Sequence, residues 1–156
     1  MKENITIRQA TMSDIFDLVR LRRIMFESMG FNDPNQLNSA DQAATEYFNN
    51  AIPKNLFYGW LAISAKGNAI GSGGLVIDHH PPGPTNLSGQ IGYIMNLVTI
   101  PQYRRRGIAR RIMQTILDWL RNSNIVVSSL HATKEGKPLY EELGFEDSNE
   151  MRLELT

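Results

Sequence analysis

The chain contains no cysteine, and this absence excludes several kinds of chemistry at once. Without thiols there is no disulfide framework, no thiolate nucleophile and no cysteine-based metal centre. No run approaches the roughly 18 apolar residues of a membrane-spanning helix, and the N-terminus lacks the apolar core of a signal peptide. The sequence therefore predicts a cytoplasmic protein with no membrane partner.

The chain also lacks an excess of charge, because its 16 basic residues are balanced by 16 acidic ones. A balanced chain has no long-range field to attract a polyanion, so we expect no nucleic-acid partner. Adjacent residues on an extended chain face opposite ways, so the neighbouring His79 and His80 do not form an evident metal site. We therefore expect no bound metal ion.

Hydrophobic residues are plentiful, at 42% of 156 residues. This is enough for one core, and we expect one domain over residues 1–156. Periodicity and turn signals predict strands near 5–7, 56–64, 69–77, 92–99, 125–130 and within 145–155, and helices near 13–29, 39–50, 106–121 and 135–143. Residues 31–38 are expected to form a loop, and the apolar run 125–130 is expected to be a central strand covered on both faces. This order indicates the α/β class, with a mixed sheet and helices on both faces.

The segment from Val98 to Arg110 is the most informative part of the sequence. It joins a strand-like apolar run to an amphipathic helix, and between them lie three consecutive arginines and Gly107. A helix start has unpaired N–H groups and the positive end of the helix dipole, and glycine allows close approach of a ligand. Cations gathered at a helix start are unfavourable without an anion, so the segment predicts a phosphate site.

Two motifs carry a resemblance to a known family. The spacing Arg104-x-x-Gly107-x-Ala109 resembles the Arg/Gln-x-x-Gly-x-Gly/Ala signature of the GCN5-related N-acetyltransferases. A second block, Leu139-Tyr140-x-x-x-Gly144-Phe145, resembles the Leu-Tyr-x-x-x-Gly-Phe ending of the same family. The resemblance implies the acyl-CoA N-acyltransferase fold, a mostly antiparallel sheet that splits between its fourth and fifth strands. It also implies transfer of an acetyl group from acetyl-CoA to a primary amine.

The resemblance further implies direct transfer with no covalent enzyme intermediate. A strand amide at Val98, beside a bulge, would polarise the thioester carbonyl, and Tyr140 would protonate the departing thiolate. The chain departs from the family at Thr133, where asparagine is frequent, and at Gly136, where alanine is frequent. The residues implied to bind acetyl-CoA are Val98, Thr99, Arg104, Arg105, Arg106, Gly107, Ile108, Ala109, Arg110 and Tyr140.

The proton acceptor for the incoming amine is the least determined part of the site. Several family members place a glutamate on the fourth strand, but residues 93–98 contain no carboxylate. Asn96 lies there and cannot act as a base, so we assign it to the substrate region. By resemblance the first two helices form the acceptor wall, where Phe26 would contact the substrate. The candidates for the base are a water chain or one of Glu27, Asp78, His79, His80 and His131.

A second interpretation therefore stays open, a non-catalytic acetyl-CoA-binding module or sensor of the same fold. The missing strand carboxylate is the feature that favours it. The acceptor is a small-molecule or peptide amine whose identity the sequence does not give. The resemblance also allows a homodimer.

Overall fold

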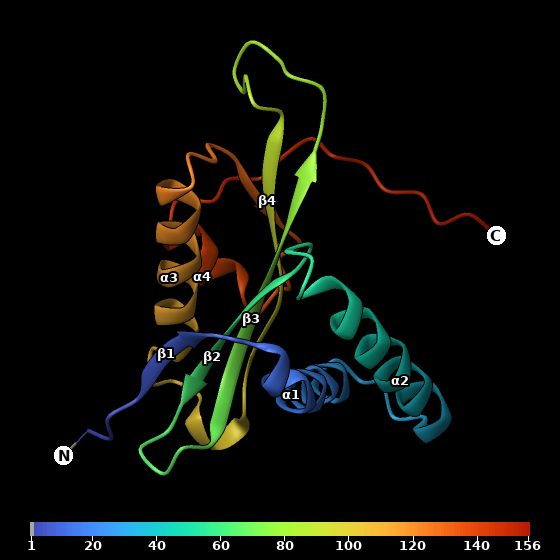
Figure 1. Cartoon of the computed structure of the whole chain (residues 1–156), viewed down its shortest axis with the longest axis vertical. Coiled ribbons are helices and arrows are strands. Elements are labelled where there is room, and N and C mark those ends of the chain that lie inside the picture. Colours follow the sequence, from blue (N-terminus) through green and yellow to red (C-terminus); the bar gives the residue numbers. More distant parts are fainter. Residues whose placement is uncertain (1) are drawn as a thin grey trace.

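The computed structural model describes residues 2–156, and its elements are arranged around a five-stranded sheet (Figure 1). The strands lie in the sheet in chain order, and neighbours are antiparallel except for the parallel last two. Their bounds are β1 Thr6–Gln9, β2 Tyr58–Ile63, β3 Ala69–His79, β4 Gln90–Thr99 and β5 Ser128–Leu130. The mixed, mostly antiparallel sheet that the sequence predicted is confirmed.

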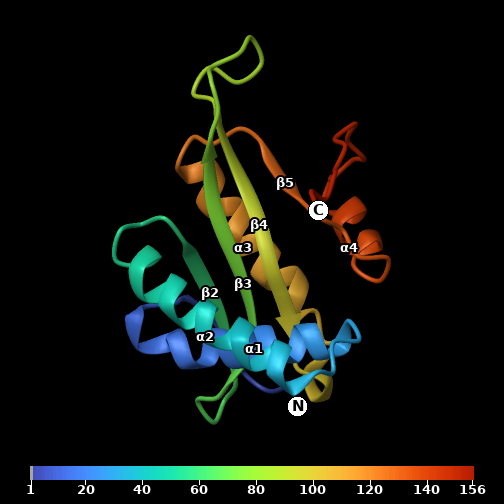
Figure 2. The same ribbon diagram turned by 90° about the vertical axis from the view of Figure 1, so that its right-hand side faces the viewer.

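Helices cover both faces of this sheet (Figures 1 and 2). On one face lie α1 (Ile15–Ser28) and α2 (Pro34–Ala51), and on the other lie α3 (Ile108–Asn122) and the short α4 (Lys137–Glu142). Short 3-10 turns, Met12–Asp14 and Pro101–Tyr103, precede α1 and follow β4. Among residues 2–156, no helix combines the length and the apolar character needed to cross a membrane.

The helix α3 is the element that positions the predicted phosphate site, and it is packed tightly onto the sheet. Its residues Ile112, Met113 and Ile116 are fully buried in one apolar cluster with the strands. Two strand glycines allow this approach: a Cβ on Gly73 would lie 2.7 Å from Ile112, and one on Gly92 would lie 2.5 Å from Leu120. The start of α3 is therefore held rigidly at the end of β4.

The first helical segment is stabilised by a buried carboxylate. Both carboxylate oxygens of Asp14 accept hydrogen bonds from the guanidinium of Arg8, at 2.8 and 2.9 Å, and the backbone N–H of Thr11 donates to one of them at 2.8 Å. These donors favour the charged form, with the Arg8 hydrogen bond as the largest cause, and lower the pKa of Asp14 to about 2.

Replacing Asp14 with asparagine is expected to lower the free energy of unfolding at pH 7. A pKa held near 2, against 3.8 for the free group, corresponds to roughly 2 kcal/mol of stabilisation. The pKa is lowered in the folded state, so this stabilisation is complete above about pH 4 and is lost as the pH falls towards 2. Urea unfolding at pH 7 and pH 3 measures it. A gap between wild type and variant that stays equally large at pH 3 would contradict the assignment.

The start of α2 and the length and position of β5 differ from the sequence prediction. Residues 34–38 were expected in a loop but open α2, because the Asp33 side chain accepts a hydrogen bond from the Asn35 N–H and Pro34 occupies the first turn. The predicted central strand at 125–130 is also wrong. Only Ser128–Leu130 forms a strand, and it lies at the sheet edge with Val126 69% exposed.

The predicted closing strands within 145–155 are likewise absent from the described residues. The C-terminal segment leaves the body as an extended chain (Figure 1, red). Met151, Leu153 and Leu155 are 98%, 80% and 90% exposed, respectively. The alternating pattern is that of a strand, but a strand forms only where a second strand accepts its hydrogen bonds.

Candidate functional site

The start of α3 presents a set of unpaired backbone donors. Gly107 adopts φ 75°, and no atom lies within 4 Å of the position that its Cβ would occupy. The first hydrogen bond of the helix runs from the Arg111 N–H to the Gly107 carbonyl at 3.1 Å. Within residues 2–156, no backbone carbonyl accepts from the N–H groups of residues 108–110. The loop and first turn therefore offer free donors to an anion.

Most arginines of the cluster already have partners. The Nε of Arg104 donates to the Thr99 carbonyl at 3.1 Å, Arg110 pairs with Glu142 of α4, and Arg111 donates to the Ile5 carbonyl at 2.7 Å. Arg106 stacks over the Tyr103 ring, with its guanidinium carbon 4.7 Å from the ring centre. Among the described residues, Arg105 and Arg106 form no ion pair. These two side chains are the available cations beside the helix start.

The sheet opens next to this site. Strands β4 and β5 pair only from Gly92 to Ile94, with Ser128 to Leu130 opposite. Beyond Ile94 and Leu130 the two strands diverge, while β4 continues to Thr99 (Figure 2). The exposed edge of β4 therefore runs from the split directly to the start of α3.

A bulge lies in the part of β4 that pairs with β3 but not with β5. Across the sheet Ser72 faces Val98 but Gly74 faces Met95, so β4 holds one extra residue there. Asn96 takes φ 54°, a conformation that asparagine tolerates better than most residues. Because of the extra residue, the side chains that follow it in β4 face the opposite side of the sheet from the one they would face in a regular strand.

The bulge determines which amides face the split. The Ile100 N–H donates to the Ile70 carbonyl of β3 at 2.9 Å. Because N–H directions alternate along a strand, the Val98 N–H also points to β3, and the amides of Leu97 and Thr99 point to the open edge. Val98 itself is buried, and its carbonyl packs against Gly71. Nothing in the sequence singled out Leu97, because only the bulge selects it.

Thr99 adds an unpaired polar atom to this region. Its hydroxyl oxygen is buried and has no hydrogen-bond partner among residues 2–156. Buried hydroxyls are normally paired. This hydroxyl is therefore still able to form a hydrogen bond.

Tyr140 lies on α4, against the apolar cluster that α3 forms with the sheet. Burial raises the pKa of its hydroxyl. A Cβ on Gly136 would lie 2.9 Å from the Tyr140 ring and 3.1 Å from its hydroxyl oxygen, so the ring occupies the space that an alanine would need. Thr133, the other departure from the family pattern, accepts the Gly136 N–H on its hydroxyl at 3.1 Å. The two departures together accommodate this position of Tyr140.

Among the candidate bases, His131 has the most specific contact. It follows the last paired residue of β5, and its Nδ1 forms a hydrogen bond with the Tyr93 hydroxyl of β4. Burial is the main cause that raises the pKa of Tyr93. Tyr93 is the second residue that sequence reasoning missed, since 38 positions separate it from His131.

The other candidates are less well placed. Glu27 is exposed near the end of α1, and Asp78, His79 and His80 lie at the hairpin end of β3, away from the start of α3 (Figure 1). Within residues 2–156, no group of three potential metal ligands gathers. Phe26 stands on α1 under the Arg22 guanidinium, 4.8 Å from its ring centre, and contacts Phe31 edge to face.

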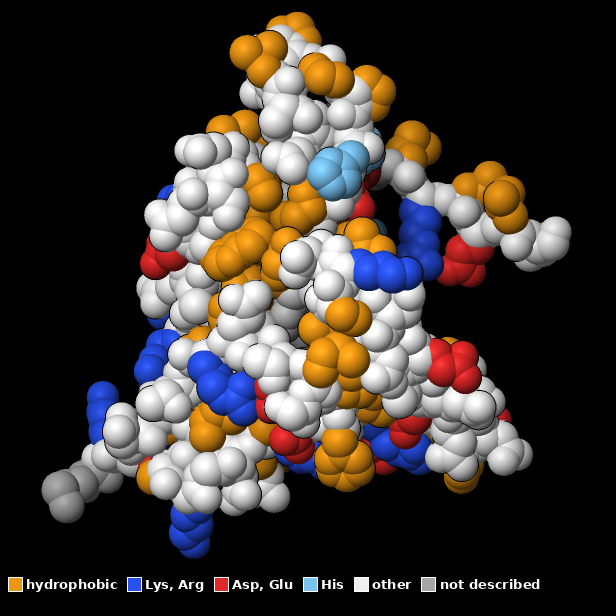
Figure 3. All heavy atoms as spheres, viewed as in Figure 1, with side chains coloured by type: hydrophobic (Ala, Val, Ile, Leu, Met, Phe, Trp, Pro, Cys, Tyr) orange, Lys and Arg blue, Asp and Glu red, His pale blue; other side chains and the backbone are white. Residues whose placement is uncertain are grey.

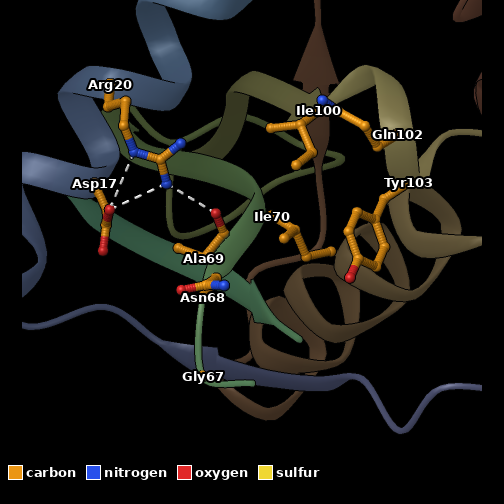
Figure 4. A pocket seen from close by; sticks show the side chains of 9 residues that line it. All are labelled: Asp17, Arg20, Gly67, Asn68, Ala69, Ile70, Ile100, Gln102 and Tyr103. Carbon is orange, nitrogen blue, oxygen red and sulfur yellow. Dashed lines mark hydrogen bonds and ion pairs between the residues drawn. The ribbon is translucent and has the colours of Figure 1, made fainter. Parts of the chain in front are cut away.

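A separate cavity of about 540 Å³ is lined by residues of α1, of the turn into β3 and of the loop that leaves β4 (Figure 4). Its charged groups are already satisfied, because Arg20 donates to Asp17 at 3.1 Å and to the Ala69 carbonyl at 2.8 Å. Tyr103 lines it, but the arginines of the α3 start do not. The cavity therefore lacks the two available arginines, Arg105 and Arg106, beside the start of α3.

Comparison with known proteins covers nearly the whole chain. The Acetyltransferase (GNAT) family matches residues 19–145. A predicted acetyltransferase with acetyl-CoA from Clostridium acetobutylicum is 33% identical, with a TM-score of 0.86 over 98% of this chain and 96% of that chain. A GCN5-related N-acetyltransferase from Ralstonia eutropha JMP134 is 27% identical, with a TM-score of 0.88 over 97% and 99%. Glucosamine-6-phosphate N-acetyltransferase from Arabidopsis thaliana, 15% identical with a TM-score of 0.74 over 98% and 99%, shares the fold. No curated protein matches the chain.

Proposed function

The chain belongs to the GNAT family of acetyltransferases, and from this premise we propose that it transfers an acetyl group from acetyl-CoA directly to a primary amine. The observation that carries the proposal is the free-donor start of α3 beside the split between β4 and β5. The proposal includes a single N-acetyltransferase domain over residues 1–156. A cytoplasmic location, a homodimer and the absence of a nucleic-acid partner stay predictions.

The pyrophosphate of acetyl-CoA would lie on the amides from Gly107 to Arg110, with Arg105 and Arg106 as outer charge partners. Its pantetheine arm would follow the open edge of β4, where the buried Thr99 hydroxyl has no partner among residues 2–156. The residues present therefore fit this co-substrate. With the pyrophosphate at the start of α3 and the arm along β4, the acyl end would lie in the split.

Acetyl-CoA supplies the activated acetyl thioester. The Leu97 amide, which faces the open edge, donates to the carbonyl oxygen as the C–N bond forms, and it replaces Val98 in the role that the sequence suggested. As the C–S bond breaks, the Tyr140 hydroxyl gives its proton to the sulfur. The raised pKa of Tyr140 keeps that proton available at neutral pH.

The Tyr93–His131 pair would accept the proton that the acceptor ammonium loses. If His131 carries its hydrogen on Nδ1, this N–H donates to the Tyr93 oxygen and the free Nε2 accepts the proton of the ammonium. If the hydrogen is on Nε2, the Tyr93 hydroxyl gives its proton to Nδ1 and takes the proton of the ammonium in its place. The missing strand carboxylate therefore does not by itself favour a non-catalytic module.

Release of CoA thiol measures the proposed activity directly, because the chain has no cysteine of its own. We expect a thiol reagent to report release from acetyl-CoA that depends on an added primary amine, with the acetylated amine found by mass spectrometry. The panel should contain amino acids, polyamines, amino sugars and peptides. Binding of acetyl-CoA without release on any of them would favour the alternative, a non-catalytic acetyl-CoA-binding module.

Replacing His131 with asparagine is expected to lower kcat/KM for the amine by about 10- to 100-fold at pH 7. The loss should shrink at pH 9, because alkaline solution deprotonates the amine without help from the protein. The matched control is His79→Asn, because His79 is an exposed histidine at the end of β3, and this variant should change kcat/KM little. Equal losses at both pH values would remove His131 from the role of base.

A further inference from the structure

Arg22, in the second half of α1, carries a charge that has no partner within the described chain. Its Nε atom is buried and meets no hydrogen-bond acceptor among residues 2–156. The ion pairs formed within the same residues do not include Arg22. Burial lowers the pKa of its guanidinium, because the charged form loses water. Buried charges are normally paired, so this cation is a candidate for binding an anion.

The acidic side chain whose charge acts on Arg22 is already paired with another arginine. This side chain is Asp41 of α2. The Nη1 of Arg23 donates to its carboxylate at 2.7 Å and to the Asn38 side chain at 3.0 Å. Figure 3 shows acidic and basic side chains close together over α1 and α2. Two arginines share one carboxylate here, so the group of Arg22, Arg23 and Asp41 keeps one net positive charge.

The ring of Phe26 supports the Arg22 guanidinium without using its hydrogen-bond donors. The guanidinium carbon lies 4.8 Å from the ring centre. Phe31, in the connection from α1 to α2, packs edge to face on Phe26, with the ring centres 5.7 Å apart. An aromatic face attracts a guanidinium and leaves its N–H groups for an acceptor. The Arg22 side chain is only partly buried, so a carboxylate or phosphate can reach it and accept two parallel hydrogen bonds.

Arg22 and the proposed proton acceptor lie on the same face of the sheet. Helix α1 packs on β4, on the face opposite α3 (Figures 1 and 2). Gly92 faces α3, since a Cβ there would meet a leucine of that helix, so the next residue, Tyr93, faces the α1 side. Val76, which pairs with Tyr93 across the sheet, packs in the apolar cluster beneath α1. An acceptor on this face can therefore present its amine to the Tyr93–His131 pair and another group to Arg22.

We propose that the acceptor amine also carries an anionic group, a carboxylate or a phosphate, and that Arg22 binds this group. The inference rests on the proposed function, because it names the substrate class of the same site. An acceptor of this kind supplies the negative charge that Arg22 lacks. A polyamine would instead bring further positive charge beside an unpaired cation and is rejected by repulsion. Arg22 therefore selects the acceptor, while Tyr93, His131 and Tyr140 transfer the protons.

Two pairs of amines that differ in the anionic group test the inference. Phosphoethanolamine is compared with ethanolamine, and alanine with alaninamide, by calorimetric titration of the protein with and without saturating CoA. We expect the anionic member of at least one pair to bind about 10-fold or more tightly than its partner, because hydrogen bonds to charged groups are strong. Equal or weaker binding of both anionic members would overturn the inference. Thiol release from acetyl-CoA is measured separately, so tight binding of an anionic amine without turnover on any amine would contradict the proposed function alone.

Replacing Arg22 separates recognition of the anion from a structural role. For the anionic amine, Arg22→Gln should raise the dissociation constant and KM about 10- to 100-fold with little change in kcat, and should abolish the difference within the pair. Arg22→Lys keeps the charge but not the paired donors, so it should retain part of the affinity. The matched control is Arg121→Gln, which removes an exposed arginine of α3 on the other face of the sheet. An Arg22→Gln variant that kept the preference for the anionic amine, or an equal loss in Arg121→Gln, would show the inference to be wrong.

Discussion

Replacing Gly107 with glutamate is expected to weaken acetyl-CoA binding by on the order of 100-fold, about 2.7 kcal/mol. The residue stands at φ 75° directly before α3, with open space around its Cβ position. A carboxylate there would lie where the pyrophosphate is proposed to bind and would repel it in a partly dehydrated site. Isothermal titration calorimetry with acetyl-CoA measures the change.

Two further variants separate charge from backbone strain. Gly107→Ala introduces the strain of a left-handed non-glycine residue without a charge, so it should weaken binding much less. Gly30→Glu adds the same side chain at another open position with φ 101°, just after α1, which covers the opposite face of the sheet from α3. If Gly30→Glu weakened binding as much as Gly107→Glu, the effect would be general and the phosphate site would not be at α3.

Replacing Tyr140 with phenylalanine is expected to lower kcat about 100-fold with little change in acetyl-CoA affinity. The ring packs against the core and against Phe145, so phenylalanine should hold the same place and lose only the hydroxyl. That hydroxyl is the proposed proton donor to the departing thiolate. Steady-state kinetics with an accepted amine, combined with calorimetry, give the two numbers.

The matched control is Tyr58→Phe, since Tyr58 is a partly buried tyrosine that packs on Trp119 far along the sheet. It should leave kcat nearly unchanged. Thioesters with better leaving groups should restore part of the Tyr140→Phe rate, because they need less help from an acid. An unchanged kcat for Tyr140→Phe would remove this residue from the acid role and leave the proton to water.

The parts of the site that the sequence predicted are those built from neighbouring residues. The phosphate site needs only a strand end, three arginines, Gly107 and a helix start, all within one short segment. The order of elements likewise followed from periodicity, because the apolar stripe of α3 and the alternating strands each bury one face. The corrected start of α2 was also readable, since Asp33 followed by Pro34 is a helix-start signal.

The parts that escaped prediction depend on residues far apart in the chain. The bulge at Asn96 is a mismatch between β3 and β4, and it alone makes the Leu97 amide face the split. The contact between Tyr93 and His131 exists only because β4 and β5 pair in one particular register. The run 125–130 shows the same limit, because its apolar residues predict a central strand but only Ser128–Leu130 pair, and only with β4.

The most direct test of the account is a crystal structure of the protein with acetyl-CoA. We expect the pyrophosphate on the amides of residues 107–110 and the thioester between β4 and β5, with its carbonyl oxygen at the Leu97 N–H and its sulfur near Tyr140. Acetyl-CoA bound instead in the cavity lined by Asp17, Arg20 and Tyr103, with the start of α3 empty, would contradict it.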